Sequence, residues 1–124
     1  MICIDTSSLI AFLEGESGPD VDLVAQVLRN YTGILAPVTV SEVLSDPKIP
    51  SDLVEILMEI PVLPLTDGYW ARSGRLRALA RRHGRKANLP DTLIAQCCLD
   101  NDVPLITRDG DFEVFSRMAA LVIL

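Results

Sequence analysis

Residues 91–112 most constrain the fold, because they predict a helix that begins with an acid and leads directly into a buried strand that ends in two acids. The helix start is marked by Pro90-Asp91, since a first-turn proline and a carboxylate near the positive end of the helix dipole both favour it. The apolar run Val103–Thr107 then predicts a strand that stops at Asp109-Gly110-Asp111. Such positions meet at one edge of an α/β sheet, so we expect these acids to lie together.

A further acid follows the first predicted strand, Ile2–Ile4. Asp5 stands where that strand ends, and the apolar residues after it predict a helix capped by Ser7 or Ser8. In an open α/β sheet this is where ligands bind. The alternative is that Asp5 is itself the helix N-cap.

The next acid in this pattern is Glu42, which follows the predicted strand Ile34–Val38 and lies on the first turn of a helix. We expect Glu42 to point toward the same sheet edge as Asp5. The alternative is structural, because Thr39 with an acid three residues later also matches a capping box.

Basic residues are concentrated in one segment, although the net charge of the chain is −6. Seven of the eleven Lys and Arg residues lie between Arg72 and Lys86, and no acid occurs between Gly68 and Pro90. The segment predicts a helix to about His83, in which Trp70 and Leu76 make apolar contacts. It is either a solvated basic face or a phosphate-binding surface, for which Arg is well shaped.

The whole chain alternates predicted strands and helices, which indicates an α/β fold with a mostly parallel central sheet. Its length of 124 residues suits one domain, over residues 1–124. The prolines of Pro61–Leu65 place that segment at a sheet edge, and Leu121–Leu124 predicts the last strand.

Several classes of protein are excluded by composition. No apolar run reaches the roughly 20 residues of a membrane span, and the first residues lack a secretory pattern, so we expect a cytoplasmic protein. The three cysteines, Cys3, Cys97 and Cys98, do not have zinc-binding spacing with the single histidine, and buried reduced thiols are expected.

Five carboxylates at one sheet edge would repel one another, and burial would oppose their ionisation further. A bound cation removes that cost, and oxygen ligands without His or Cys suit Mg²⁺ or Mn²⁺. Such ions support in-line attack on phosphodiesters. An acidic metal site next to a basic segment therefore predicts a nuclease.

The same residues resemble the PIN-domain nucleases, and most closely the VapC-type toxins of toxin–antitoxin pairs. The resemblance covers essentially the whole chain, in order. It is carried by Ile4-Asp5-Thr6-Ser7, Ser41-Glu42-Val43, Arg75-Leu76-Arg77-Ala78, Gly84-Arg85, Asp91-Thr92-Leu93-Ile94-Ala95 and Leu105-Ile106-Thr107-Arg108-Asp109-Gly110-Asp111-Phe112. Gln96 and Cys97-Cys98 stand where smaller residues are commoner.

The resemblance implies a three-layer α/β/α sandwich and a Mg²⁺- or Mn²⁺-dependent endoribonuclease. It also implies a homodimer that a cognate antitoxin inhibits. It assigns catalysis to Asp5, Glu42, Asp91 and Asp109, and metal binding to Asp5, Asp91, Asp109 and Asp111. Either Asp109 or Asp111 is the fourth acid. Ser7 and Thr107 match the supporting polar residues, and from the basic segment we expect Arg75, Arg82, Arg85 and Lys86 to bind RNA.

Two other hydrolase-like patterns fit poorly. A haloacid-dehalogenase phosphatase needs an acid two residues after Asp5, where this chain has Ser7, and a receiver domain needs a lysine that neither Lys48 nor Lys86 supplies. The stronger rival is a PIN-fold module that binds RNA or a partner without cutting it. Metal-dependent cleavage that is lost in Asp5→Asn distinguishes the two.

Overall fold

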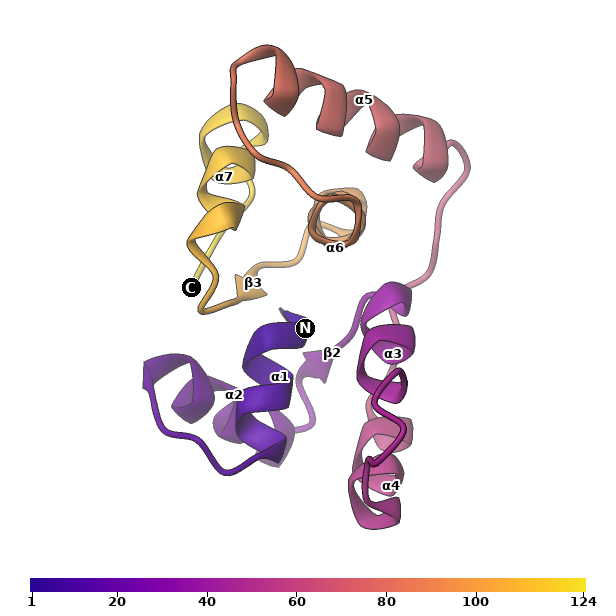
Figure 1. Ribbon diagram of the computed structural model, residues 1–124, viewed down its shortest axis with the longest axis vertical. Coiled ribbons are helices and arrows are strands. Elements are labelled where there is room, and N and C mark those ends of the chain that lie inside the picture. Colours follow the sequence, from indigo (N-terminus) through magenta and orange to yellow (C-terminus); the bar gives the residue numbers. More distant parts are fainter.

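The computed structural model describes all residues, 1–124, as three parallel strands with seven α-helices and one 3-10 helix (Figure 1). The elements in chain order are β1 (Ile2–Ile4), α1 (Thr6–Leu13), α2 (Pro19–Arg29), β2 (Gly33–Ile34), α3 (Pro37–Leu44), α4 (Ser51–Glu59), α5 (Tyr69–Arg82), α6 (Leu89–Asn101), β3 (Leu105–Ile106), η1 (Gly110–Phe112) and α7 (Glu113–Ala119).

The sheet has the order β2-β1-β3, so the first strand of the chain lies in its middle. Cys3 pairs with Ile34 on one side and with Leu105 on the other, both in parallel register. Single parallel bridges extend the sheet at both edges, from Leu35 to Val62 and from Leu105 to Ile123. The expected parallel sheet is thereby confirmed.

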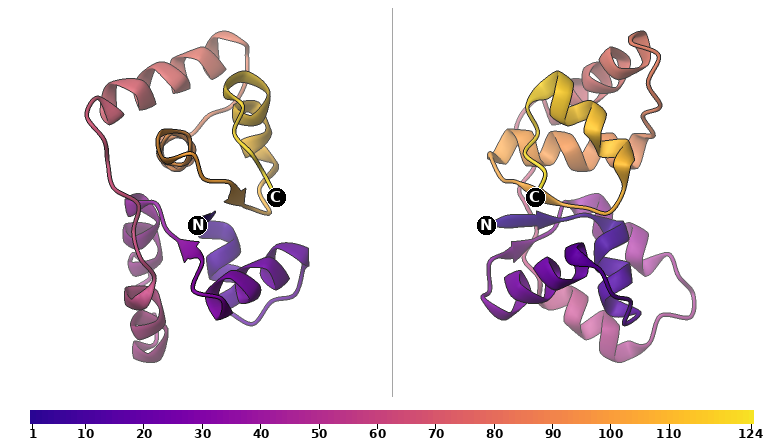
Figure 2. Two further views of the ribbon diagram at one scale, coloured as in Figure 1. Left: turned by 180° about the vertical axis from the view of Figure 1, so that it is seen from behind. Right: turned by 90° about the vertical axis from the view of Figure 1, so that its left-hand side faces the viewer.

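Helices cover both faces of this sheet. In the right-hand view of Figure 2, α5, α6 and α7 lie on one side of β1, and α1, α2 and α4 lie on the other. Neighbouring residues of each strand point to opposite faces, so β1 and β3 contribute to both cores. Cys3 and Leu105 belong to the core beneath α6, whereas Ile4 and Ile106 belong to the core with α1 and α2. The three-layer α/β/α sandwich is confirmed.

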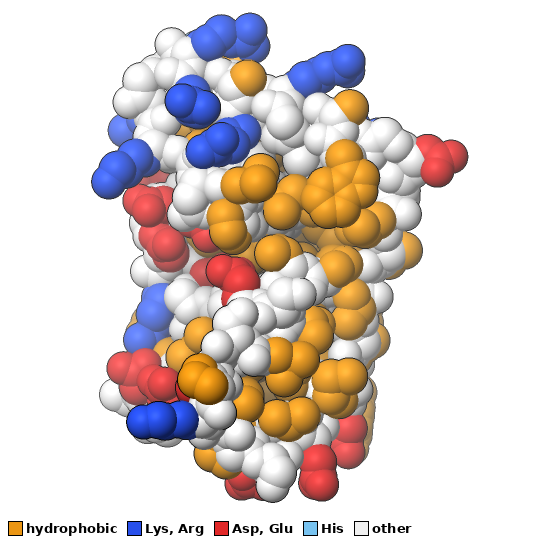
Figure 3. All heavy atoms as spheres, turned by 45° about the vertical axis from the view of Figure 1, so that its right-hand side comes forward, with side chains coloured by type: hydrophobic (Ala, Val, Ile, Leu, Met, Phe, Trp, Pro, Cys, Tyr) orange, Lys and Arg blue, Asp and Glu red, His pale blue; other side chains and the backbone are white.

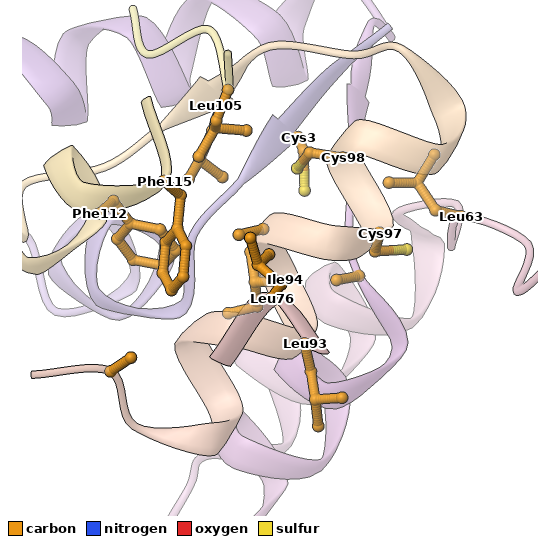
Figure 4. Packing of buried hydrophobic residues seen from close by; sticks show 14 of the residues in the cluster. Cys3, Leu63, Leu76, Leu93, Ile94, Cys97, Cys98, Leu105, Phe112 and Phe115 are labelled. Atoms are coloured by element: carbon orange, nitrogen blue, oxygen red, sulfur yellow. The ribbon is translucent and has the colours of Figure 1, made fainter. Parts of the chain in front are cut away.

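Helix α6 is the centre of the larger core. Its residues from Thr92 to Cys98 are all buried, which a helix shows only when protein surrounds it on most sides. Figure 4 shows Ile94 of α6 near Leu76 of α5, and Cys98 beside Cys3 of the sheet. Burial raises the pKa of the Cys97 thiol to about 12, and all three cysteines are free and buried, as expected.

Some helix starts differ from the predictions. Ser7 and Ser8 lie inside α1, whose N-cap position is occupied by Asp5. Helix α3 begins at Pro37, not after Val38, because the fixed backbone of proline suits a first helical turn. Residues 121–124 form one bridge rather than a strand of four residues.

The basic helix also packs differently from the prediction. Leu76 and Ala80 are buried as expected, but Trp70 is 68% exposed and touches the ring of Tyr69 edge-on instead of entering the core. Gly84 ends this segment in the left-handed conformation, at φ +70°, which glycine adopts without strain. No helix in the chain is both long and apolar enough to span a membrane.

Candidate metal centre and nucleic-acid groove

Asp5 lies at the carboxyl end of the central strand and is only 2% exposed. Its Oδ2 atom accepts hydrogen bonds from the hydroxyls of Ser7 and Thr107, the latter at 2.8 Å. Burial raises the pKa of Asp5, although these two hydroxyls act against the shift, and the charge of Asp109 raises it slightly more. The side chain makes no capping bond to α1, so the N-cap alternative does not account for the carboxylate.

Glu42 is held at the same edge by threonines of two helices. Thr6 Oγ1 lies 2.7 Å from Glu42 Oε1 and 3.0 Å from the Oγ1 atom of the fully buried Thr39. The capping-box alternative is wrong, because Ala36 occupies the N-cap position of α3 and Thr39 lies within the helix. Thr6 fixes one carboxylate oxygen of Glu42, Thr39 contacts Thr6 from the other helix, and Oε2 is left without a protein partner.

Asp91 lies in the first turn of α6 and shares two hydrogen bonds with the N-cap residue Asn88. The Asp91 amide donates to Asn88 Oδ1 at 2.8 Å, and Asn88 Nδ2 donates to Asp91 Oδ2 at 2.9 Å. Burial raises the pKa of Asp91 to about 6, the Asn88 bond partly opposes this, and the charges of Asp5, Asp109 and Glu42 raise it further. The last effect shows that these carboxylates share one electrostatic site.

The remaining acids are carried by the turn after β3. Asp109 Oδ1 accepts the amide hydrogen of Asp111 at 2.9 Å, and the Asp109 amide donates to Thr107 Oγ1 at 3.0 Å. These bonds shape the single 3-10 turn, and buried Phe112 anchors its end. Carboxylate oxygens of Asp91, Asp109 and Asp111 lie within 4.8 Å of one another.

The structure therefore places three of the five acids, Asp91, Asp109 and Asp111, within reach of one cation, and Asp5 and Glu42 lie near enough for their charges to raise the pKa of Asp91. We call Asp5, Glu42, Asp91, Asp109 and Asp111 the acidic site. Oxygen atoms are the only donors that its side chains offer, which fits a hard cation such as Mg²⁺ or Mn²⁺. Burial and neighbouring charges raise the pKa of Asp91, so its ionised form is unfavourable, and a bound cation would relieve that cost.

A basic groove adjoins the acidic site. Its cationic lining is Arg77, Arg81, Arg85 and Lys86, and it reaches Asn88 and Asp111 at its inner end. Figure 3 shows Lys and Arg side chains gathered over the upper end of the molecule, above a group of acidic side chains at the left edge.

Not all the arginines expected to bind RNA line this groove. Arg85 and Lys86 do, but Arg75 and Arg82 do not, and Arg77 and Arg81 are found there instead. Residues 75 and 77 differ by about 200° around a helix, so they face opposite sides of α5. Arg77 also donates from Nε to the Ala87 carbonyl at 2.8 Å, which ties α5 to the segment before α6.

A family model for the PIN domain matches residues 2–119. The chain belongs to the PIN-domain family. No curated protein sequence matches it. Solved structures similar to this PIN domain include VapBC2 from Rickettsia felis bound to a promoter DNA fragment, at 18% identity and TM-score 0.74, covering 100% of this chain and 98% of that one.

Two further structures resemble the PIN domain over nearly their whole length. VapBC-1 from nontypeable Haemophilus influenzae is 22% identical with TM-score 0.74, and the match covers 100% of this chain and 97% of that one. VapBC-5 from Mycobacterium tuberculosis, a member of the VapBC family of toxin–antitoxin systems, is 24% identical with TM-score 0.68 and coverages of 99% and 96%. At these identities the likeness shows a shared fold.

Two groups at the site were missed by the sequence analysis. Asn88 could have been found, because an Asn three residues before an acid in a helix start is a capping pattern. Thr6 had no such signal for binding Glu42 and Thr39, since these contacts join residues more than 30 positions apart.

Proposed function

We propose that this PIN domain is a metal-dependent endoribonuclease and the toxin of a toxin–antitoxin pair. The observation that carries the proposal is the meeting of the Asp91, Asp109 and Asp111 carboxylates within 4.8 Å, beside buried Asp5. Carboxylates this close repel one another, and a bound cation would relieve that repulsion. The basic groove beside it favours a polyanionic substrate.

Asp5, Asp91, Asp109 and Asp111 would hold the ion, because each can supply a carboxylate oxygen to Mg²⁺ or Mn²⁺. A bound ion would polarise the scissile phosphate and lower the pKa of the attacking water. Ser7 and Thr107 hold Asp5 in one orientation, and Asn88 does the same for Asp91. Glu42 is fixed through Oε1, so its Oε2 atom can accept a hydrogen bond or proton from the water.

RNA phosphates bind in the basic groove and lead the strand toward Asp111. Arg81, Arg85 and Lys86 are exposed, and no hydrogen bond or ion pair engages their side chains, so their charges are available. Arginine fits phosphate oxygens with a planar fork. Contacts of this type give affinity and register without reading the base sequence.

The double substitution Arg81→Ala/Arg85→Ala should weaken binding of a single-stranded RNA about ten-fold at moderate salt. It should also make the slope of log K against log salt shallower by about 1.4, since each lost phosphate contact contributes about 0.7. Fluorescence anisotropy over a salt series measures both quantities. The matched control is Arg75→Ala/Arg82→Ala, which removes the same charge from residues of α5 outside the groove. Equal losses in the two variants would contradict the assignment of the groove.

The proposal also assigns protein partners to the exposed apolar surface of the chain. Figure 3 shows a broad hydrophobic area across the middle of one face. Large apolar side chains that the chain leaves exposed include Ile56, Met58, Val62, Leu65 and Trp70. Exposed apolar area of this kind marks interfaces with proteins, and we assign it to homodimerisation and to a cognate antitoxin.

The test is a Mg²⁺ and Mn²⁺ titration of the purified chain, with thermal stability and cleavage of a mixed RNA pool followed in the same samples. Both metals should raise the melting temperature, and the RNA should be cut internally with the same metal dependence. RNA that is bound but not cut at any metal concentration would favour the alternative of a catalytically silent RNA-binding module. A chain that responds to neither metal would refute the metal site.

A further inference from the structure

An ion pair between Asp20, whose side chain is nearly buried, and Arg108, whose side chain is 32% exposed, links the turn that carries Asp109 and Asp111 to the junction between α1 and α2. The Arg108 guanidinium bonds both oxygens of Asp20, from Nε to Oδ2 at 2.8 Å and from Nη2 to Oδ1 at 3.1 Å. It also reaches the Ser17 carbonyl at 3.3 Å and the Glu16 carboxylate at 3.6 Å. The Asp20 side chain is only 10% exposed, so this is a fixed contact and not a loose surface pair.

The ion pair closes a ring of contacts around Asp5. Asp20 accepts a hydrogen bond from Ser8 at 2.8 Å, and the neighbouring Ser7 donates to Asp5. On the other side, Thr107 donates to the same Asp5 oxygen, and Arg108 is the next residue in the chain. The two backbone segments that hold Asp5 are thus tied to each other a second time, through Arg108 and Asp20.

The Arg108–Asp20 contact adds a further restraint on the turn after β3. The turn after β3 is held at one end by the bond from the Asp5 amide to the Ile106 carbonyl, at 2.9 Å, and at the other by buried Phe112. Between them stand Asp109 and Asp111, whose carboxylates face Asp91 and repel it. Without Arg108, that repulsion is resisted by the bonds inside the turn, the Thr107–Asp5 bond and the anchors at the two ends.

We propose that Arg108 and Asp20 are positioning residues that hold the Asp109–Asp111 turn in the geometry needed to bind the divalent cation. The inference rests on the proposed function, because it concerns the same metal site. Neither side chain touches the ion. Both act through the backbone, as partners outside the ligand set of a metal commonly do.

The direction in which the affinity for the cation changes in Arg108→Ala distinguishes a positioning role from a purely electrostatic one. Arg108→Ala removes a positive charge close to the acidic site, which by Coulomb's law alone would make a cation bind more tightly. Positioning predicts the opposite. We expect the Kd for Mn²⁺, measured by calorimetry on RNA-free protein, to rise about ten-fold in Arg108→Ala and in Asp20→Ala.

Three comparisons make the test specific. The double variant Arg108→Ala/Asp20→Ala should bind Mn²⁺ no more weakly than the worse single variant, because both lose the same contact. Arg29→Ala, which removes a charge from the exposed end of α2, should bind as the unaltered chain does. Arg108→Lys keeps the charge and a single contact with Asp20, should show an intermediate Kd, and decides the matter if the alanine variant fails to fold.

RNA cleavage supplies a second readout. In Arg108→Ala the Mn²⁺ concentration for half-maximal cleavage should rise by the same factor of about ten, while the rate at saturating Mn²⁺ recovers. An unchanged or lower Kd in both Arg108→Ala and Arg108→Lys would overturn the inference and leave the proposed function intact. Failure of the unaltered chain to bind Mn²⁺ would instead refute the proposed function, and the inference with it.

Discussion

Asp5→Asn should abolish metal-dependent RNA cleavage, with a loss of about a thousand-fold or more, while the protein stays folded. Asp5 is the buried carboxylate at the end of the central strand, and its charge acts on Asp91 and is acted on by Asp109. An amide of the same shape still accepts the hydrogen bonds of Ser7 and Thr107, so the packing is preserved. It no longer supplies the charge that binds the cation, and loss of one central electrostatic contact has effects of this size.

The measurement is a single-turnover cleavage rate at saturating Mn²⁺, with circular dichroism and thermal melting of the same sample. Asp22→Asn is the matched control, because it neutralises an exposed acid of α2 outside the acidic site, and it should cleave at the unaltered rate. If Asp5→Asn were folded and still cut RNA normally, the nuclease assignment would be refuted. If it unfolded, Asp5 would have a structural role in the strand end.

The parts of the fold that followed from the sequence are those fixed by local patterns. Short apolar runs that end in acids identified β1 and β3, because a buried parallel strand leaves few other choices. Four of the acids were found by the same reasoning, since they stand close to a strand end or a helix start, whereas Glu42, expected on the first turn of a helix, lies in the second turn of α3. The alternation of elements was enough to place them at one edge of the sheet.

Helix boundaries followed less well, because two signals competed. Leu35-Ala36-Pro37-Val38 is apolar and reads as a continuing strand, but proline cannot donate to a sheet and fits a first helical turn. The structure follows the proline and starts α3 there. The prediction for Trp70 was wrong for another reason. Trp70 was expected to make apolar contacts as Leu76 does, but its place at the start of α5 leaves most of its side chain exposed.

Contacts between distant residues carried no sequence signal. Arg108 and Asp20 are 88 positions apart, and nothing in either segment indicates the other. For the residues of the basic groove, the sequence supplied part of the information but not all of it. Helical spacing separates Arg77 and Arg81 from Arg75 and Arg82, but only the packing of α5 against α6 decides which pair faces the acidic site.

Asp91→Asn should stabilise the metal-free protein at neutral pH and remove its response to metal. The folded-state pKa of Asp91, about 6, lies above the ordinary value of 3.8, so the charged carboxylate destabilises the fold. That cost is fully present above pH 6, shrinks as the pH falls toward 3.8, and is absent below it. Allowing for solvent screening of a half-buried group, the amide should add about 1–2 kcal/mol at pH 7.5.

In EDTA at pH 7.5 the variant should therefore melt about 3–8 °C higher than the unaltered chain, and at pH 4 the two should converge. Added Mn²⁺ should reverse the order at pH 7.5, because it stabilises only the protein that binds it. Glu55→Gln removes an exposed charge from α4 and should show neither effect. A lower melting temperature for Asp91→Asn in EDTA would mean that its bonds with Asn88 outweigh the repulsion. Asp91 would then serve the start of α6 more than the cation. If Asp91→Asn melts at a higher temperature in EDTA and Mn²⁺ does not raise the melting temperature of the unaltered chain above it, the acids repel one another without forming a metal site.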